Sequence, residues 1–156
     1  MNYWLMKSEP STFGIDHLAR AKNRTTAWDG VRNYQARNFL RDQMKKGDLA
    51  FFYHSSCDVP GIAGIVKIVR EGYPDRSAFD KKDDHYDPDS DPQNPRWYVV
   101  DVQLETKFDD VITLEVLREH SKGPLKDMLL LKRGNRLSIT PVTKSEWSFI
   151  ESLARE

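Results

Sequence analysis

Aromatic and small polar residues that suit nucleobase binding occur in this sequence where strands are expected to end and a helix is expected to begin. A flat ring can stack on the face of a base, and a hydroxyl or amide can bond to its edge. The set comprises Ser8, Trp28, Asn33, Tyr34, Arg37, Tyr53, His54, Ser55 and Ser138. Each Ser or Asn taken singly is more simply a cap or turn residue, so only the set as a whole indicates base binding.

Trp28 is the residue of this set on which the hypothesis depends most. It precedes Asp29 and Gly30, so its backbone is expected in a turn, and loops often carry binding sites. The alternative is an ordinary core tryptophan. We predict that Trp28 forms a wall of a base-binding pocket.

Sequence signatures of catalysis are few. The chain lacks a glycine-rich phosphate loop, an H-E-x-x-H motif and a G-x-S-x-G motif. Its one cysteine, Cys57, excludes an internal disulfide and a multi-cysteine zinc site, and we interpret it as a structural thiol despite His54 nearby. His85 within the acidic run 83–87 is at most a weak metal site. We therefore predict no catalytic residues, no metal, no cofactor and no enzymatic activity.

The charges are unevenly distributed although the formal net charge is +0. Residues 1–46 hold nine Lys and Arg against four acids, whereas residues 75–92 hold seven Asp against three bases. A neutral total therefore does not exclude a basic patch that contacts phosphates. The residues predicted to bind phosphate are Lys7, Arg32, Arg37, Arg41, Lys132, Arg133 and Arg136. The stretch 75–95 is predicted to be a solvated acidic loop.

Short strands separated by a few helices must position these side chains. Hydrophobic patterning predicts strands over 2–7, 49–54, 62–69, 97–108 and 136–141. It also predicts a helix over 33–46 capped by Asn33, and a final helix opened by a Thr143–Glu146 capping box. This order favours one α+β domain over residues 1–156, with a curled, barrel-like mixed sheet.

The N-terminal stretch is too short and too polar to resemble a signal peptide, and no apolar run approaches the ~20 residues of a membrane span. We expect a cytoplasmic protein, or a nuclear one in a eukaryote, without a membrane partner. The sequence does not set the oligomeric state, and a monomer is expected.

Several long motifs resemble the EVE domain family over nearly the whole chain. They are YWLMKSEP at 3–10, WDGVRNYQARN at 28–38, GD at 47–48 with FFYHS at 51–55, GIAG at 61–64, and RLS at 136–138 with Pro141. The resemblance implies a PUA-like pseudo-barrel of mixed, mostly antiparallel strands decorated by short helices. It also implies kinship with the YTH domains, which bind methylated adenine in RNA through an aromatic cage.

Members of this family are regarded as readers of modified bases, notably modified cytosines in DNA, so the resemblance implies a nucleic-acid partner. Carried over to this chain, it places Ser8, Trp28, Asn33, Tyr53 to Ser55 and Ser138 in the pocket, with Trp97 as a looser candidate for a second aromatic wall. Two alternatives stay open because a fold does not fix a function. One is an RNA-binding or RNA-modification-associated protein of the same fold, and the other is a sensor of free nucleosides.

Overall fold

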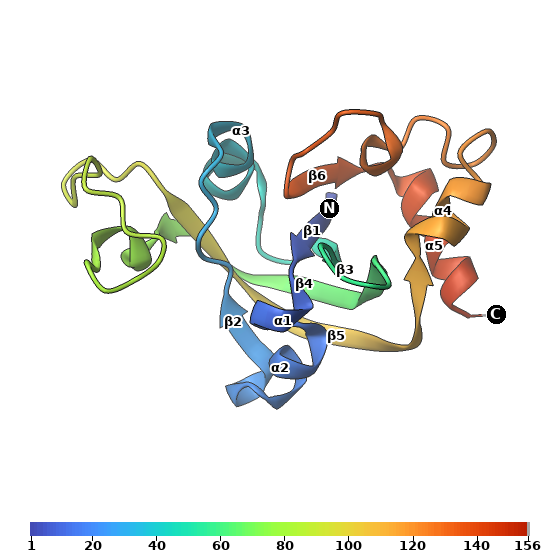
Figure 1. Ribbon diagram of the computed structural model, residues 1–156, viewed down its shortest axis with the longest axis horizontal. Helices are drawn as coiled ribbons and strands as arrows, with labels where there is room; N and C mark the ends of the chain where they lie inside the picture. The colour runs from blue at the N-terminus through green and yellow to red at the C-terminus, as the bar shows by residue number, and fades with distance from the viewer. Residues whose placement is uncertain (156) are drawn as a thin grey trace.

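The computed structural model describes residues 1–155 and contains a six-stranded mixed sheet with short helices packed around it (Figure 1). The strands are β1 (Tyr3–Ser8), β2 (Thr25–Ala27), β3 (Leu49–His54), β4 (Gly61–Pro74), β5 (Tyr98–Thr113) and β6 (Ile139–Val142). The α-helices are α1 (Pro10–Phe13), α2 (Ile15–Arg20), α3 (Tyr34–Asn38), α4 (Leu114–Glu119) and α5 (Lys144–Ala154), and the 3₁₀ segments are Lys22–Arg24, Arg76–Phe79 and Leu129–Leu131. The α+β prediction is confirmed.

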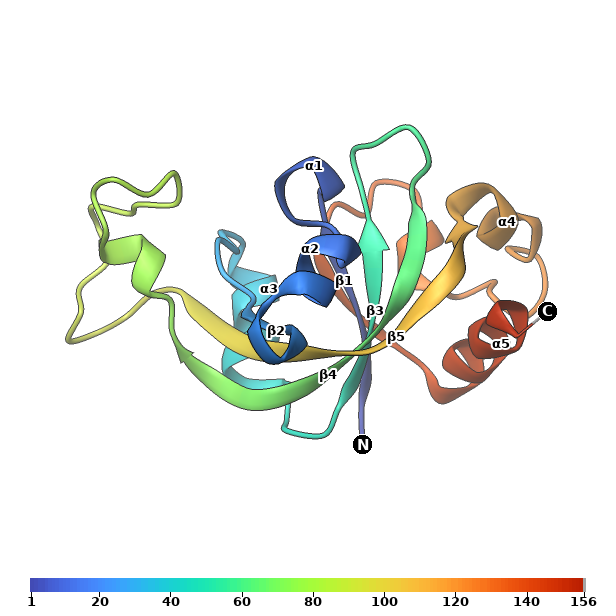
Figure 2. The same cartoon turned by 90° about the horizontal axis from the view of Figure 1, so that it is seen from below.

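The strands are ordered β2-β5-β4-β3-β1-β6 across the sheet. β1 runs parallel to β3, and the other neighbours are antiparallel. β4 and β5 form a long, strongly curved ribbon that runs from the 75–97 segment at one end toward α4 and α5 at the other (Figure 2). Within residues 1–155, β2 and β6 remain the sheet's two edges, so the predicted pseudo-barrel is a curled sheet that does not close.

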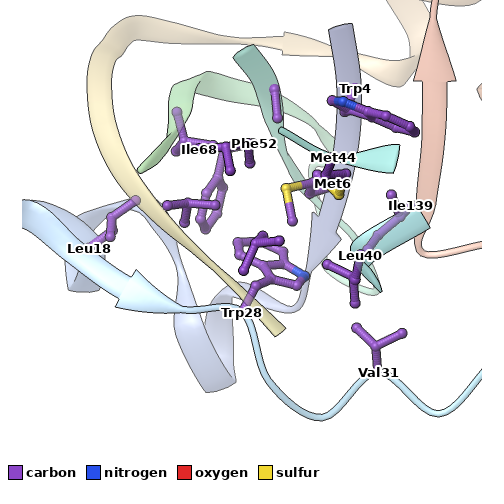
Figure 3. Packing of buried hydrophobic residues seen from close by; sticks show 14 of the residues in the cluster. Trp4, Met6, Leu18, Trp28, Val31, Leu40, Met44, Phe52, Ile68 and Ile139 are labelled. Atoms are coloured by element: carbon purple, nitrogen blue, oxygen red, sulfur yellow. The ribbon is translucent and has the colours of Figure 1, made fainter. Parts of the chain in front are cut away.

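Each face of the sheet is buried under its own hydrophobic cluster, because successive strand residues point to opposite faces. In β1, Trp4 and Met6 join one cluster, whereas Leu5 joins the other. The first cluster also receives Trp28 and side chains from α2 and α3 (Figure 3). The second receives side chains from α4 and α5, including Trp147. Trp28 therefore enters the molecule on the same face as Met6.

The predicted helix over 33–46 starts at the predicted cap but is shorter than predicted. The Asn33 side chain accepts a hydrogen bond of 3.0 Å from the backbone N–H of Ala36, which confirms the cap. After Asn38 the chain continues as a π-helical turn over Phe39–Gln43, and Met44 already has extended backbone angles. The capping box of Thr143 and Glu146 at the start of α5 is confirmed.

Candidate functional site

A cavity of about 670 Å³ opens beside the carboxyl end of β1. Its lining comes from five parts of the chain: the end of β1, α1, the connection from β2 towards α3, a single residue of the 75–97 segment, and the residue before β6. Three of the predicted base-binding residues lie here, namely Ser8, Trp28 and Ser138. Two of the predicted phosphate-binding residues, Lys7 and Arg32, also line it.

Trp28 is both a cavity-lining residue and a member of the first hydrophobic cluster. Its side chain is 7% exposed and meets the Phe52 ring edge-on, with the ring centroids 5.4 Å apart (Figure 3). Its backbone N–H donates to the carbonyl of Val100 in β5 at 2.8 Å. From the sequence, a pocket wall and a core residue were alternatives for Trp28. In the structure the same indole packs in the first hydrophobic cluster and also lines the cavity.

The two serines of the cavity are held by backbone contacts between neighbouring strand ends. Lys7 donates its backbone N–H to the carbonyl of Ser138 at 2.8 Å, and Ser55 donates to the carbonyl of Ser8 at 2.9 Å. The Ser8 hydroxyl itself donates to the carbonyl of Phe13 at 2.6 Å, which ties α1 to the strand end. Partial burial lowers the pKa of the Lys7 amine. Backbone hydrogen bonds to their carbonyls, together with the Ser8 hydroxyl bond to Phe13, therefore fix the positions of Ser8 and Ser138 in the cavity lining.

The cavity lining does not include His54 or Ser55. His54 Nε2 accepts a hydrogen bond of 3.1 Å from the backbone N–H of Ile15, at the start of α2. Burial lowers the pKa of the His54 imidazole, which fits this role as a neutral acceptor. Tyr53 is not brought to the cavity, because strand alternation turns its ring into the second hydrophobic cluster.

A separate group of side chains lies outside the cavity lining at α3 and consists of Tyr34, Arg37 and Trp97. The Tyr34 ring stacks on the Trp97 ring at 5.0 Å between centroids, and the Arg37 guanidinium lies 5.0 Å from the Tyr34 centroid. Trp97 donates its indole N–H to Asp87 at 2.6 Å. Trp97 therefore anchors the end of the 75–97 segment, and the structure does not place it in the cavity.

The 75–97 segment is anchored at its other end by Arg32, so the predicted solvated acidic loop is only partly solvated. Asp75 is 1% exposed and pairs with Arg32 at 3.0 Å, while Ser77 and Ala78 are also buried. Arg32 additionally donates from Nη2 to the carbonyl of His85 at 2.6 Å. Burial opposes ionisation of Asp75, but hydrogen bonds from Ser77, Gly30 and Arg32 outweigh it and lower the pKa of this carboxyl.

The contact with Arg32 places His85 in the cavity lining. The sequence did not predict this position for His85. Gly30 has a φ of +79°, and a side-chain carbon at position 30 would lie 2.6 Å from Nε2 of the His85 ring. The His85 Nδ1 atom in turn lies 3.1 Å from a carboxylate oxygen of Asp83. The only sequence signal of this contact was the glycine after Trp28-Asp29, which marks a close approach without naming the partner.

The predicted phosphate-binding residues differ in how freely they can reach a ligand. Arg32 is engaged as described, and Arg37 donates to the carbonyl of Arg96 at 2.8 Å. Arg41 is exposed but pairs with its neighbour Asp42 at 2.8 Å. Lys132, Arg133 and Arg136 are exposed on the stretch that leads into Ser138 at the cavity, although Lys132 also lies 4.0 Å from Asp127 and donates to the carbonyl of Lys126 at 3.3 Å. This stretch is therefore the basic surface of the predicted set that is both exposed and connected to the cavity.

The part of the chain that the structure describes holds no group of three or more His, Cys, Asp and Glu side chains arranged to bind a metal ion. Over the same residues, no helix is both long and apolar enough to cross a membrane.

Residues 2–153 match the family model described as the EVE domain. Thymocyte nuclear protein 1 of Danio rerio is 51% identical over 168 residues, which cover 98% of this chain and 72% of the relative.

Two solved structures are similar along almost their whole length. The crystal structure of human THYN1 protein in complex with 5-methylcytosine-containing DNA has a TM-score of 0.95 and 48% sequence identity, covering 100% of this chain and 99% of that one. A crystal structure of a protein from Pseudomonas putida has a TM-score of 0.91 and 46% identity, covering 97% and 99%.

Proposed function

The chain belongs to the EVE domain family, and on that premise we propose that it binds nucleic acid and holds one modified base, a modified cytosine in DNA, in the cavity beside Trp28. The observation that carries the proposal is the cavity itself, where an indole lies near serines on rigid strand ends. Its volume of about 670 Å³ falls within the range of small-molecule sites. The 48% identical human relative, solved with 5-methylcytosine-containing DNA, supports the choice of base.

In this proposal the base leaves the stack of its strand and enters the cavity, where Trp28 contacts its face. Proteins that act on a single base in a duplex extrude it in this way, at a cost of a few kcal/mol. The exposed side chains of Lys132, Arg133 and Arg136 hold the flanking phosphates and offset that cost. Affinity then comes mainly from the basic stretch, and selectivity from the cavity.

We further propose that the protein performs no reaction on the bound base. The Ser8 hydroxyl donates to the carbonyl of Phe13, so its proton is not held by a general base that would activate the oxygen. A modified oligonucleotide incubated with the protein is therefore expected to keep its mass, and a change of mass would contradict this part of the proposal.

A sensor of free nucleosides is the second candidate, and the engagement of Arg32 and Arg37 within the protein favours it. Salt dependence separates the two functions, because each phosphate contact contributes roughly one unit to the slope of log affinity against log salt. Binding of a 5-methylcytosine duplex should therefore weaken steeply with salt, whereas a sensor's affinity would be flat.

A variant with Lys132, Arg133 and Arg136 all changed to Gln should lose about two to three units of that slope. Its preference for the modified base should stay unchanged, since the cavity is intact. The matched control changes Lys45, Lys46 and Lys67 to Gln, which lie near the opposite ends of β1 and β3. Equal slopes in both variants would show that the 132–136 stretch does not contact phosphates.

A further inference from the structure

We propose that Asp29 selects bases that carry an amino group at pyrimidine C4 or purine C6, by accepting a hydrogen bond from that amine beside Trp28. This inference rests on the proposed function and names the edge of the base that the cavity recognises. It restricts the ligands to cytosine-type and adenine-type bases.

Asp29 is positioned for such a contact by the backbone on both sides of it. Trp28 donates to the carbonyl of Val100 at 2.8 Å, and Asp29 donates its own N–H to the carbonyl of Ala27 at 3.1 Å. Gly30 then donates to a carboxylate oxygen of Asp75 at 2.9 Å. Three consecutive N–H groups are thus fixed, and Asp29 lines the cavity next to the indole. A short side chain on a fixed backbone has little freedom to lose when it binds a ligand.

The carboxylates of Asp29 and Asp75 have opposite environments. Asp75 accepts hydrogen bonds from Gly30, from Arg32, and from both the N–H and the hydroxyl of Ser77. Among residues 1–155, no other residue donates a hydrogen bond to the Asp29 carboxylate or pairs with it. The Asp75 carboxylate is thus bonded within the protein, whereas the exposed Asp29 carboxylate beside the indole is open to water or to a donor from a ligand.

The pKa values follow this difference. Asp29 is exposed at the cavity, but its partial burial raises the pKa of its carboxyl, the neighbouring charge of Asp75 raises it further, and the charge of His85 lowers it. A donor from a ligand would relieve that unfavourable environment, as hydrogen bonds to Asp75 already do within the protein. The Asp29 carboxylate is therefore an acceptor whose ionised form gains stability when an amine arrives.

Base chemistry determines what such an acceptor selects. An ionised carboxylate accepts hydrogen bonds and cannot donate them. Cytosine carries an amino group at C4 and adenine at C6, whereas thymine and guanine carry a carbonyl oxygen at these positions and the amino group of guanine is on C2. A carboxylate at this edge attracts the first pair and repels the second. The cleanest comparison is 5-methylcytosine with thymine, because both carry the 5-methyl group and differ in the C4 substituent and in the proton on the adjacent N3.

The experiment measures affinities for three duplexes that are identical except for a central cytosine, 5-methylcytosine or thymine. The central base faces an abasic site in each duplex, so that base pairing does not bias its extrusion. The wild-type protein is expected to bind 5-methylcytosine roughly ten- to 100-fold more tightly than thymine, the contribution of one charge-assisted hydrogen bond. The isosteric Asp29→Asn variant should bring that ratio to within about twofold, because an amide can also donate to thymine's carbonyl.

Asp110→Asn is the matched control, since it removes the same charge from an exposed strand position outside the cavity lining. Its discrimination should equal that of the wild type. An unchanged ratio in Asp29→Asn overturns the inference while leaving the proposed function standing. Loss of the ratio in Glu9→Gln alone also overturns it, because Glu9 is the other carboxylate of the lining. Wild-type protein that binds none of the three duplexes overturns the proposed function itself.

Discussion

Replacing Trp28 with leucine is expected to weaken binding of a 5-methylcytosine oligonucleotide by roughly five- to 150-fold, the range for loss of one base–aromatic stack. Leucine retains apolar contact with Phe52 but offers no ring to the cavity. Because the indole is 7% exposed and packs in the first cluster, truncation to alanine would also cost about 3–5 kcal/mol of unfolding free energy. The leucine variant should lose less, which keeps the binding measurement interpretable.

The control for this variant is Trp147→Leu. Trp147 is 2% exposed and stacks on Phe51 at 3.8 Å in the second cluster, away from the cavity. Denaturant titration gives the folded fraction of each variant, and affinity is then compared per folded molecule. Trp147→Leu should lose stability while retaining wild-type affinity and selectivity. If the folded Trp28→Leu protein binds and discriminates as the wild type does, Trp28 is a core residue only.

Arg32→Leu is expected to destabilise the protein by on the order of 3 kcal/mol, because it removes one partner of a buried ion pair. The value lies at the low end for such pairs, since the side chain of Arg32 is 23% exposed and Asp75 keeps its bonds from Gly30 and Ser77. The same change releases the carbonyl of His85. Hydrogen exchange should therefore accelerate mainly in residues 75–97, and selectivity for the modified base should fall.

The pH dependence of this loss follows from Asp75. Its pKa is lowered in the folded protein, so the pair contributes fully above the ordinary carboxyl pKa of about 4 and loses its contribution as the pH falls through the folded value. The unfolding free energies of wild type and Arg32→Leu should therefore converge on acidification. Arg41→Leu is the control, because Arg41 pairs on the surface with its neighbour Asp42 and should barely shift the unfolding midpoint. A constant gap at all pH values would show that Arg32 acts through packing alone.

Features of the fold that depend on local sequence were predictable. The Asn33 cap and the Thr143–Glu146 box need only residues within one helical turn, and both form as predicted. The strand over 49–54 needs only its own β-prone side chains. The long motifs that resemble the EVE domain family implied a pseudo-barrel of mostly antiparallel strands; the strand directions are confirmed, but the sheet does not close.

Features that depend on distant contacts were not predictable. Tyr53 and His54 are adjacent, yet strand alternation sends Tyr53 into the second cluster with Phe51, and which face of the sheet borders the cavity depends on distant segments. Trp97 was a candidate pocket wall, but its indole is held by Asp87 and Tyr34 instead. His85 reaches the cavity through Arg32, 53 residues earlier in the chain. No pattern within a short window of sequence encodes such a pairing.

The proposed base-binding role of the cavity is tested most directly by the affinity of the purified protein for two DNA duplexes that differ only in one 5-methyl group on a central cytosine. We expect tighter binding of the methylated duplex, with a preference that disappears in Trp28→Leu and persists when Lys132, Arg133 and Arg136 are neutralised. Equal affinity of the wild-type protein for the two duplexes, at several salt concentrations, would contradict the claim that this cavity holds a methylated cytosine.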